Sequence, residues 1–457
     1  MTENSQHLNH FSLLEKRAIA SVASLYGFRM LGLFMVLPVM ALYFEDYRGS
    51  TPFLLGLSLG IYGFTQAILQ IPLGLLSDKI GRRPVILFGL IIFILGSVVA
   101  ALSDSASGLI VGRALQGMGA IASTLMALVT DFTSEQNRTK AMAAIGGTIG
   151  ISFVVAMILG PLIAVAAGLS GVFWMTAVLG VLGIVIFTLT IPKTLTIHKN
   201  RETQTDLRQI GILFREPKLL RLNLGIFCLH LALMAAFVVI PTVLSKELGI
   251  SADNLWWVYL SLLGVGFVAM LPIMILSEKL NRQKHSFVTA IAVMAGSMMV
   301  LGVSRNSLVT PLMLLAFFTA FNLLEATLPS WLSKVCPVGN RGTAMGIYSS
   351  SQFMGAFVGG VLGGWGLGHI GIDGLFMLLA AILLLWCLLA LTMQSPKPLQ
   401  TLVLQVGNSN PDEFVKIISN IVGVEDILLV EGEDLAYIKV DKKTVDLPSL
   451  QPFFNRK

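Results

Sequence analysis

The sequence predicts a polytopic membrane protein whose membrane part is all α-helical, followed by a small α+β domain. Three observations lead to this fold class. Only 12% of the 457 residues are charged, against roughly 25% in a soluble domain. Twelve apolar stretches are near or above the roughly 20 residues that cross a hydrocarbon core of about 30 Å. After residue 398 the composition changes to six basic and nine acidic residues, so the last segment is of a different kind.

The apolar stretches begin near residue 18, after a polar start. No cleavable signal peptide is expected, because the first apolar run is too long for an h-region and lacks a small-residue cleavage site. The turns near 103–107, 168–170 and 371 are minimal and all fall on one side. The predicted spans are 18–44, 53–77, 84–103, 107–131, 139–167, 170–191, 219–245, 254–277, 285–303, 308–333, 341–369 and 372–393.

Basic residues are distributed unequally between the two ends of the spans. Twenty lysines and arginines lie at the inner ends, whereas the other side has only Arg48, Lys246 and Arg305. The positive-inside rule therefore places both termini in the cytoplasm. Since the basic residues form short clusters between helices, nucleic-acid binding is not expected.

The chain contains an internal repeat. The Asn-Arg pair at 137–138 recurs at 340–341, and Pro38 matches Pro241, both at an offset of 203 residues. Two such halves in parallel register enclose a site near the bilayer midplane and can rock about it, so the sequence predicts movement of a solute by alternating access. The predicted units are a first half (1–192), a charged cytoplasmic linker (193–218), a second half (219–395) and a cytoplasmic domain (399–457).

Two segments resemble the Major Facilitator Superfamily. Between the second and third spans, 74–84 (GLLSDKIGRRP) resembles motif A of that superfamily in every defining position. In the fourth span, 113–120 (RALQGMGA) resembles motif B. The resemblance covers about residues 15–395. It implies the superfamily fold of twelve transmembrane helices in two six-helix halves, and a multi-pass location in the bacterial inner membrane.

The motif A segment has a physical reading of its own. Gly74 and Gly81 let the chain turn tightly, and Arg82 and Arg83 suit the inner membrane face. The resemblance implies that Asp78 contacts the start of the eleventh span. It also implies that Arg82 pairs with Asp131, and that these contacts latch the inner gate in the outward-facing state. A positive-inside loop without a latch is the alternative.

Two arginines lie inside the first half. Arg113, Gln116, Gly117 and Ala120 share one helical face, which we expect to point into the bundle. Arg29 lies too deep to reach either surface and needs a partner or a wet cavity. Each arginine is either a buried structural residue satisfied by carbonyls or a participant in substrate binding or proton movement.

Polar residues of the second half are candidates for proton coupling. Asn322 and Glu325 lie three residues apart in the tenth span, and Glu325 is the only acid well inside any span. A carboxylate there can bind and release a proton as its surroundings change. His230 in the seventh span can titrate near neutral pH, or can form a hydrogen bond across helices.

The direction of transport has one partial signal. Gly160-Pro161 in the fifth span resembles the superfamily's antiporter motif C in part, which favours export. Close helix packing is a sufficient reason for the glycines of the fifth and eleventh spans. Inside the spans, only the negative charge of Glu325 opposes the positive charges of Arg29 and Arg113. This excess of positive charge favours an anionic or acceptor-rich substrate.

Residues 399–457 have the element order β-α-β-β-α. Strands are predicted at 401–406, 425–430 and 436–440, with helices at 411–422 and 447–454. This order suggests a ferredoxin-like domain lacking its last strand. The domain distantly resembles heavy-metal-associated domains, but loop 407–410 has no cysteine pair, so no metal is expected. It can regulate the transporter, dock on the inner face, self-associate, or stabilise the chain passively.

Together these features predict a secondary active transporter, a proton-coupled exporter (antiporter) of an unidentified small molecule. The alternatives are a uniporter or proton-coupled importer, and a transporter-like sensor or scaffold. An enzyme is not expected, since no Walker loop, nucleophile elbow or metal-ligand cluster is present. The expected partners are a small-molecule substrate, protons and the lipid bilayer, with the proton motive force in place of any cofactor.

Overall fold

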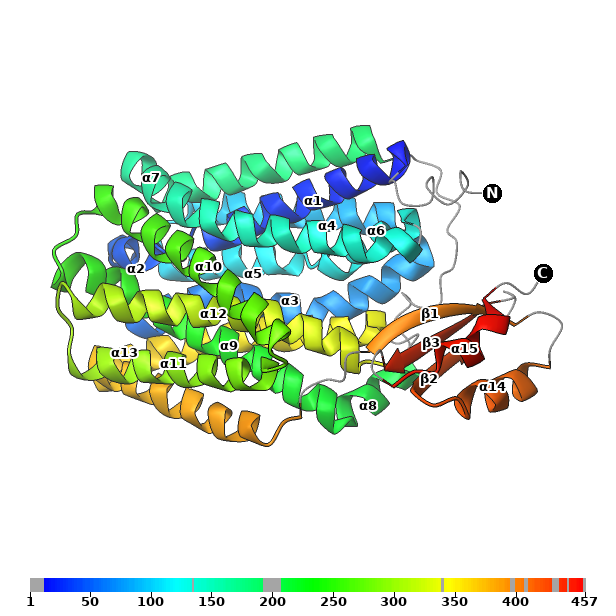
Figure 1. The fold of residues 1–457 in the computed structure, drawn as a ribbon. Helices are drawn as coiled ribbons and strands as arrows, with labels where there is room; N and C mark the ends of the chain where they lie inside the picture. The colour runs from blue at the N-terminus through cyan, green and yellow to red at the C-terminus, as the bar shows by residue number, and fades with distance from the viewer. Residues whose placement is uncertain are drawn as a thin grey trace.

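The computed structural model describes most of the chain (Figure 1). The described residues are 12–133, 135–191, 207–337, 341–394, 399–406, 410–429, 435–441 and 444–454. Outside them lie most of the predicted linker, the loop at 407–409, the hairpin turn at 431–434 and Asn340 of the repeated pair.

The first half begins with α1 (Leu13–Phe34), capped by a reciprocal pair of side-chain bonds between Ser12 and Glu15. The predicted span 18–44 is not one continuous helix, because α1 ends before Pro38, which cannot donate to a helix, and residues 35–39 form a turn. The helices that follow are α2 (Met40–Tyr43), α3 (Pro52–Ile80), α4 (Arg82–Leu102), α5 (Ala106–Met118), α6 (Ala122–Phe132) and α7 (Glu135–Thr190).

The fourth predicted span, 107–131, is also interrupted. Residues 119–121 separate α5 from α6. A Cβ atom built at Gly119 would lie 2.4 Å from the carbonyl oxygen of Gly89, so only glycine permits this close crossing with α4. The expectation that Ala120 shares a helical face with Arg113 is therefore wrong, because the helix ends at Met118.

The second half is similar to the first, except that its first and fourth spans are not interrupted. The end of the predicted linker forms a helix of its own, α8 (Leu207–Arg215), directly before α9 (Pro217–Thr242). A π-helical turn (Val243–Glu247) continues α9 past Pro241, and a short 3-10 helix (Ala252–Asn254) precedes α10. The remaining helices are α10 (Leu255–Lys279), α11 (Gln283–Val303), α12 (Val309–Val335) and α13 (Arg341–Leu391).

Two helices fold back on themselves at single glycines. α7 has 56 residues and α13 has 51. At 1.5 Å per residue each would be about 80 Å long, far more than a bilayer. Gly168 (φ 66°, ψ −175°) and Gly371 (φ 68°, ψ −175°) reverse the chain with the same backbone angles. They lie 203 residues apart, which is the offset of the sequence repeat, and both predicted minimal turns are present.

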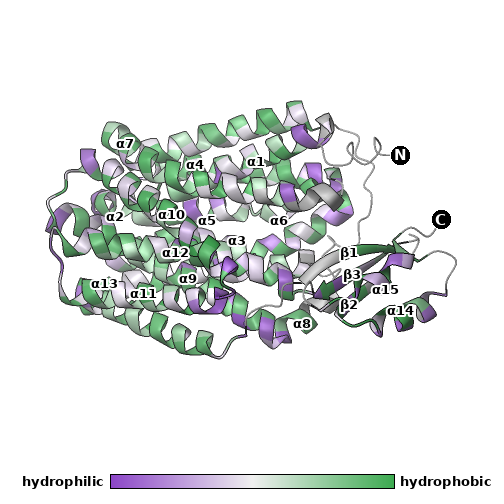
Figure 2. Ribbon diagram, in the orientation of Figure 1, coloured by the Kyte–Doolittle hydropathy of each residue, from purple (hydrophilic) through white to green (hydrophobic). Residues whose placement is uncertain are grey.

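The helices form a bundle with an apolar exterior. Figure 2 shows hydrophobic residues over the length of the helices and hydrophilic residues at the two ends and on the C-terminal domain. By length and composition, nine helical stretches of the described residues could cross a membrane. Two of these stretches, in α7 and α13, contain the reversals of the chain at Gly168 and Gly371.

Glycines set the contacts within each half. A Cβ at Gly160 would lie 2.3 Å from the Met35 carbonyl oxygen, beside the turn that ends α1. The repeat-related Gly363 would bring its Cβ to 2.8 Å from Val238, which corresponds to Met35. Close packing thus accounts for Gly160 and for Gly355, Gly359 and Gly363 of α13. It does not account for Gly146, Gly147 and Gly150, where an added Cβ would meet nothing within 4 Å, so that expectation is wrong for these three.

The halves meet along α3 and α13. Added Cβ atoms at Gly56 and Gly60 would lie 2.1 Å and 2.7 Å from the carbonyl oxygens of Gly360 and Phe357. These backbone contacts lie toward the end of the bundle opposite the termini, where Lys246 Nζ of the second half also lies 2.9 Å from Glu45 Oε1 of the first. The two halves are therefore closed against each other at that end.

The C-terminal domain is a three-stranded antiparallel sheet with the order β1-β3-β2. Phe414, Ile418, Ile438 and Leu450 are buried between the sheet and its helices. The observed order β-α-β-β-α agrees with the predicted elements. They are β1 (Leu399–Gln405), α14 (Pro411–Ser419), β2 (Val424–Leu429), β3 (Leu435–Asp441), α15 (Leu447–Leu450) and a 3-10 turn (Gln451–Phe453).

Candidate gate and transport pathway

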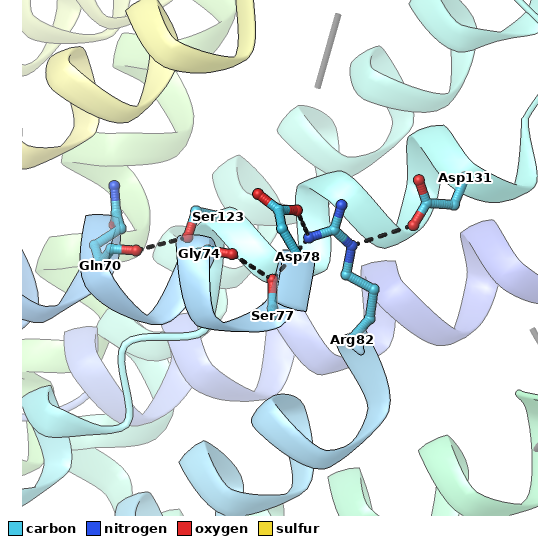
Figure 3. A network of polar contacts seen from close by, with 7 residues as sticks. All are labelled: Gln70, Gly74, Ser77, Asp78, Arg82, Ser123 and Asp131. Carbon is cyan, nitrogen blue, oxygen red and sulfur yellow. Dashed lines mark hydrogen bonds and ion pairs between the residues drawn. The ribbon is translucent and has the colours of Figure 1, made fainter. Parts of the chain in front are cut away.

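Arg82 is the centre of the motif A network (Figure 3). Its Nε donates to Asp131 Oδ2 at 3.2 Å, and its Nη1 donates to Ser77 Oγ at 2.8 Å and to Asp78 Oδ1. Arg82 is 5% exposed, so the guanidinium is removed from water but has charged partners. The pairing of Arg82 with Asp131 that the resemblance implied is present, and it joins α3, α4 and α6.

Small residues let these helices approach. Gly81 has φ 100° between α3 and α4, a conformation that favours glycine. A Cβ at Gly74 would lie 3.1 Å from Ser123 Oγ of α6, and the same hydroxyl donates to the Gln70 carbonyl at 2.9 Å. Arg83 acts within the half as well, since its Nη1 donates to the Ile191 carbonyl at 2.7 Å, at the end of α7.

Asp78 has its described partner, Arg82, in the same half. The expected contact of Asp78 with the eleventh span concerns the start of α13 at Arg341, directly after residues 338–340, which lie outside the described chain. That contact stays a prediction.

Arg29 and Arg113, the two arginines predicted inside the spans of the first half, are enclosed by the protein. Arg29 is 3% exposed and Arg113 is 0% exposed. Arg29 Nη2 donates to Tyr62 Oη and to Gln66 Oε1, both at 3.1 Å. Arg113 Nη1 donates to Gln116 Oε1 at 2.8 Å, so the predicted spacing of these two residues does bring them together.

Tyr62 connects the two arginines. Arg29 donates to its hydroxyl, and the Arg113 guanidinium carbon lies 5.1 Å from the centre of its ring. Among the described residues neither arginine has a carboxylate within ion-pair distance, and Arg29 Nε and Arg113 Nη2 are buried without a hydrogen-bond acceptor. The cluster (Arg29, Tyr62, Gln66, Arg113, Gln116) thus combines two cations with unused donors.

The second half contains a polar cluster from three helices. Gln352 Nε2 on α13 donates to Glu325 Oε1 on α12 at 3.2 Å and lies 2.9 Å from His230 Nε2 on α9. His230 Nε2 is also 3.8 Å from Glu325 Oε2. His230 is 8% exposed, while the Glu325 side chain is 37% exposed and its Oε2 makes no hydrogen bond.

The sequence predicted Glu325 and His230 as candidate residues, but Gln352 was not predicted. A glutamine after a run of three serines in an otherwise apolar span was the available signal. Asn322 lies one turn before Glu325 on α12, is half-buried, and makes no hydrogen bond in the described part of the chain.

The two polar clusters approach each other across the boundary between the halves. The rings of Tyr62 and Phe353, the neighbour of Gln352, have centroids 6.4 Å apart. Phe321 of α12 packs near both His230, at 5.9 Å, and Phe153 of α7, at 6.5 Å. Aromatic side chains therefore separate the cationic cluster of one half from the carboxylate of the other.

Comparisons with known proteins agree with this architecture. Residues 22–265 and 222–420 match the family model of the Major Facilitator Superfamily. The chain is 43% identical over 437 residues to the inner membrane transport protein YajR of Escherichia coli (strain K12), covering 94% of this chain and 96% of that protein. It is 24% identical over 338 residues to multidrug resistance protein MdtH of Aeromonas salmonicida (strain A449), covering 73% and 84%.

A solved structure gives the same fold. A bacterial homologue of the human lysosomal transporter Spinster, in an inward-facing and occupied conformation, superposes with a TM-score of 0.67 at 14% identity. The match covers 84% of this chain and 97% of that one. The chain belongs to the Major Facilitator Superfamily of membrane transporters.

Proposed function

We propose that the protein is a proton-coupled exporter of a small molecule, working by alternating access in the bacterial inner membrane. The proposal takes the helices as twelve spans in two halves, counting α5 with α6 as one and α7 and α13 as two each. Both termini lie in the cytoplasm, and the C-terminal domain is ferredoxin-like without its last strand. The proton motive force drives transport, and no cofactor takes part.

The cluster of Glu325, Gln352 and His230 carries the proposal. Glu325 has no fixed cation beside it. Its Oε1 accepts a hydrogen bond from the Gln352 amide, and its Oε2 is buried without a hydrogen bond, 3.8 Å from His230 Nε2. A carboxylate in this setting can be ionised or protonated without breaking an ion pair. Because Gln352 donates to Glu325, its other N–H is available to a neutral His230. Protonation of Glu325 would therefore alter a contact that spans three helices of one half.

The arginine cluster supports a substrate class. Two buried guanidinium groups with unused donors suit a ligand with anionic or acceptor-rich groups. The aromatic contacts between the clusters suit an apolar or planar portion in the same ligand. The expected substrate therefore has both parts.

Two observations favour export. Gly160-Pro161 matches the antiporter pattern in part, and one relative is named a multidrug resistance protein. The packing of Gly160 on Met35 is a structural reason for that glycine in either direction. A uniporter or proton-coupled importer, and a sensor or scaffold with a transporter body, are the competing functions.

Motif A serves as the gate of this cycle. The latch (Asp78, Arg82 and Asp131) lies within the first half, so it can form in either state. What changes between states is the proposed contact of Asp78 with the start of α13. A positive helix N-terminus there would attract the carboxylate and hold the inner ends together.

The test is proton flux in proteoliposomes that contain a pH-sensitive dye. Under an imposed pH gradient, a mixed library of anionic and cationic solutes is screened with wild type, Glu325→Gln and Glu278→Gln, an exposed acid at the end of α10. We expect solute-dependent proton flux in wild type and in E278Q, and no such flux in E325Q. The direction of the proton flux relative to that of the solute identifies antiport. Labelled solutes that equilibrate without proton movement would establish a uniporter, and no movement of any solute would favour the sensor.

A further inference from the structure

The central strand of the C-terminal domain, β3, is buried on both faces of the sheet, although the helices of the domain cover only one face. Ile438 and Val440 of β3 point to the helix side and are 0% and 1% exposed. Tyr437 and Lys439 point the other way, because side chains alternate along a strand. Each of these is only 6% exposed. Something outside the domain therefore covers the second face.

The cover is the end of α12. Lys439 Nζ donates to the carbonyl oxygen of Lys334 at 3.3 Å and to that of Cys336. α12 ends at Val335 with Cys336 as its cap. Figure 1 shows the sheet against the end of the bundle that carries the termini.

The chemistry of this contact is specific. The last carbonyl groups of a helix have no partner within it and carry the negative end of the helix dipole. A lysine ammonium offers three N–H donors and suits that position. A buried ammonium without such acceptors would be costly. A lysine at the centre of a sheet face thus matches a helix C-terminus better than it matches lipid or water.

We infer that this second sheet face (Val403 of β1 with Tyr437 and Lys439 of β3) is a docking surface for the C-terminal end of α12 of the same chain. Lys439 is the residue that holds it. Val403 pairs with Tyr437 in the ladder, so it shares the face, and it is 41% exposed at the margin of the contact.

A short stretch of chain connects the docked end of α12 to the proposed gate. This part of the inference rests on the proposed function of the latch. Four residues separate Cys336 from Arg341, where α13 begins. Even a fully extended chain keeps the Cα atoms of Cys336 and Arg341 within about 18 Å of each other, at up to ~3.6 Å per residue. The domain therefore holds one end of the segment whose other end is the proposed partner of Asp78, and it restrains the movement of that end.

The docking is tested by distance measurement between spin labels, which needs neither substrate nor protons. In the full-length protein, with Cys228, Cys336 and Cys387 replaced by alanine, labels are placed at Val422 and Lys279. Val422 is 68% exposed on the domain, and Lys279 is exposed at the end of α10. Lys439→Met removes the ammonium and keeps an apolar side chain, and Lys439→Arg keeps a donor. Lys416→Met removes an exposed lysine from α14 as the matched control.

We expect one narrow distance distribution for the parent, K416M and K439R, and a distribution at least twofold broader for K439M. An unchanged distribution in K439M would overturn the proposal. A dipolar signal from protein labelled only at Val422 would also overturn it, in favour of a second copy on this face. Because the readout is a distance, a docked domain in a protein without proton flux would refute the proposed function and leave this inference standing.

Discussion

At the scale of single residues, the two halves use different chemistry. In the first half, the buried Arg29 and Arg113 donate hydrogen bonds to neutral groups, which are Tyr62, Gln66, Gln116 and a backbone carbonyl. The second half places a carboxylate beside an amide and an imidazole. The structure supports both readings of a buried arginine, since Arg113 has structural partners and also an unused donor.

Arg113→Ala separates these two roles. The change leaves Gln116 Oε1 and the Ser58 carbonyl without their donor, at a cost of about 1–3 kcal/mol for each buried group. We expect the protein to insert and remain folded, with a lowered melting temperature, and to lose proton-coupled flux. Arg48→Ala, at an exposed ion pair with Asp104, is the control and should keep wild-type flux. Normal flux in R113A would assign Arg113 to structure alone.

At the scale of elements, the sequence predicted the tail strands and the two tight turns because period-two alternation and glycine positions are local signals. The breaks at 35–39 and 119–121 were missed, because they depend on which glycine or proline meets a neighbouring helix. Gln352 and Lys439 were missed for a related reason. Their roles arise from partners 27 and 103 residues away, which no local pattern shows.

The fold-back glycines of α7 and α13 give a paired prediction. Both have backbone angles that are nearly restricted to glycine. Gly168→Ala and Gly371→Ala should each lower stability by about 1–3 kcal/mol, and by similar amounts, because they occupy equivalent turns. Thermal unfolding in detergent measures this.

The matched control is Gly296→Ala inside α11, where an added Cβ meets nothing within 4 Å. There the change should be neutral or stabilising by up to about 1 kcal/mol. A large loss at only one of the two turns would show that the halves are not equivalent there.

At the scale of the whole molecule, the structure is closed at the end opposite the termini. Backbone contacts between α3 and α13 and the Lys246–Glu45 pair lie there. Two further hydrogen bonds join α3 and α13 in the described part of the chain. Ser350 Oγ donates to the Ala67 carbonyl at 3.2 Å, and Gln70 Nε2 donates to the Gly346 carbonyl at 3.5 Å. Alternating access requires that the closed contacts separate while others form at the end with the termini.

Asp78→Asn tests the gate. Arg82 keeps Asp131 and Ser77, so we expect a folded protein. Without its charge, residue 78 cannot attract a helix N-terminus, and vectorial transport should be abolished. In a background without native cysteines, maleimide labelling of Asn322→Cys from the side of the termini should rise several-fold. Asp104→Asn, at the other end, should leave both readouts unchanged, and equal labelling in D78N and D104N would remove the latch assignment.

The Lys246–Glu45 pair has a consequence for how the protein responds to its surroundings. It joins the two halves, and its side chains are 56% and 71% exposed. Dissolved salt screens such a pair, since the Debye length shortens from about 30 Å at 0.01 M to about 8 Å at 0.15 M ionic strength. In the proposed alternating-access cycle, the balance between the two conformations therefore depends on the ionic strength of the medium at that end, before any substrate binds.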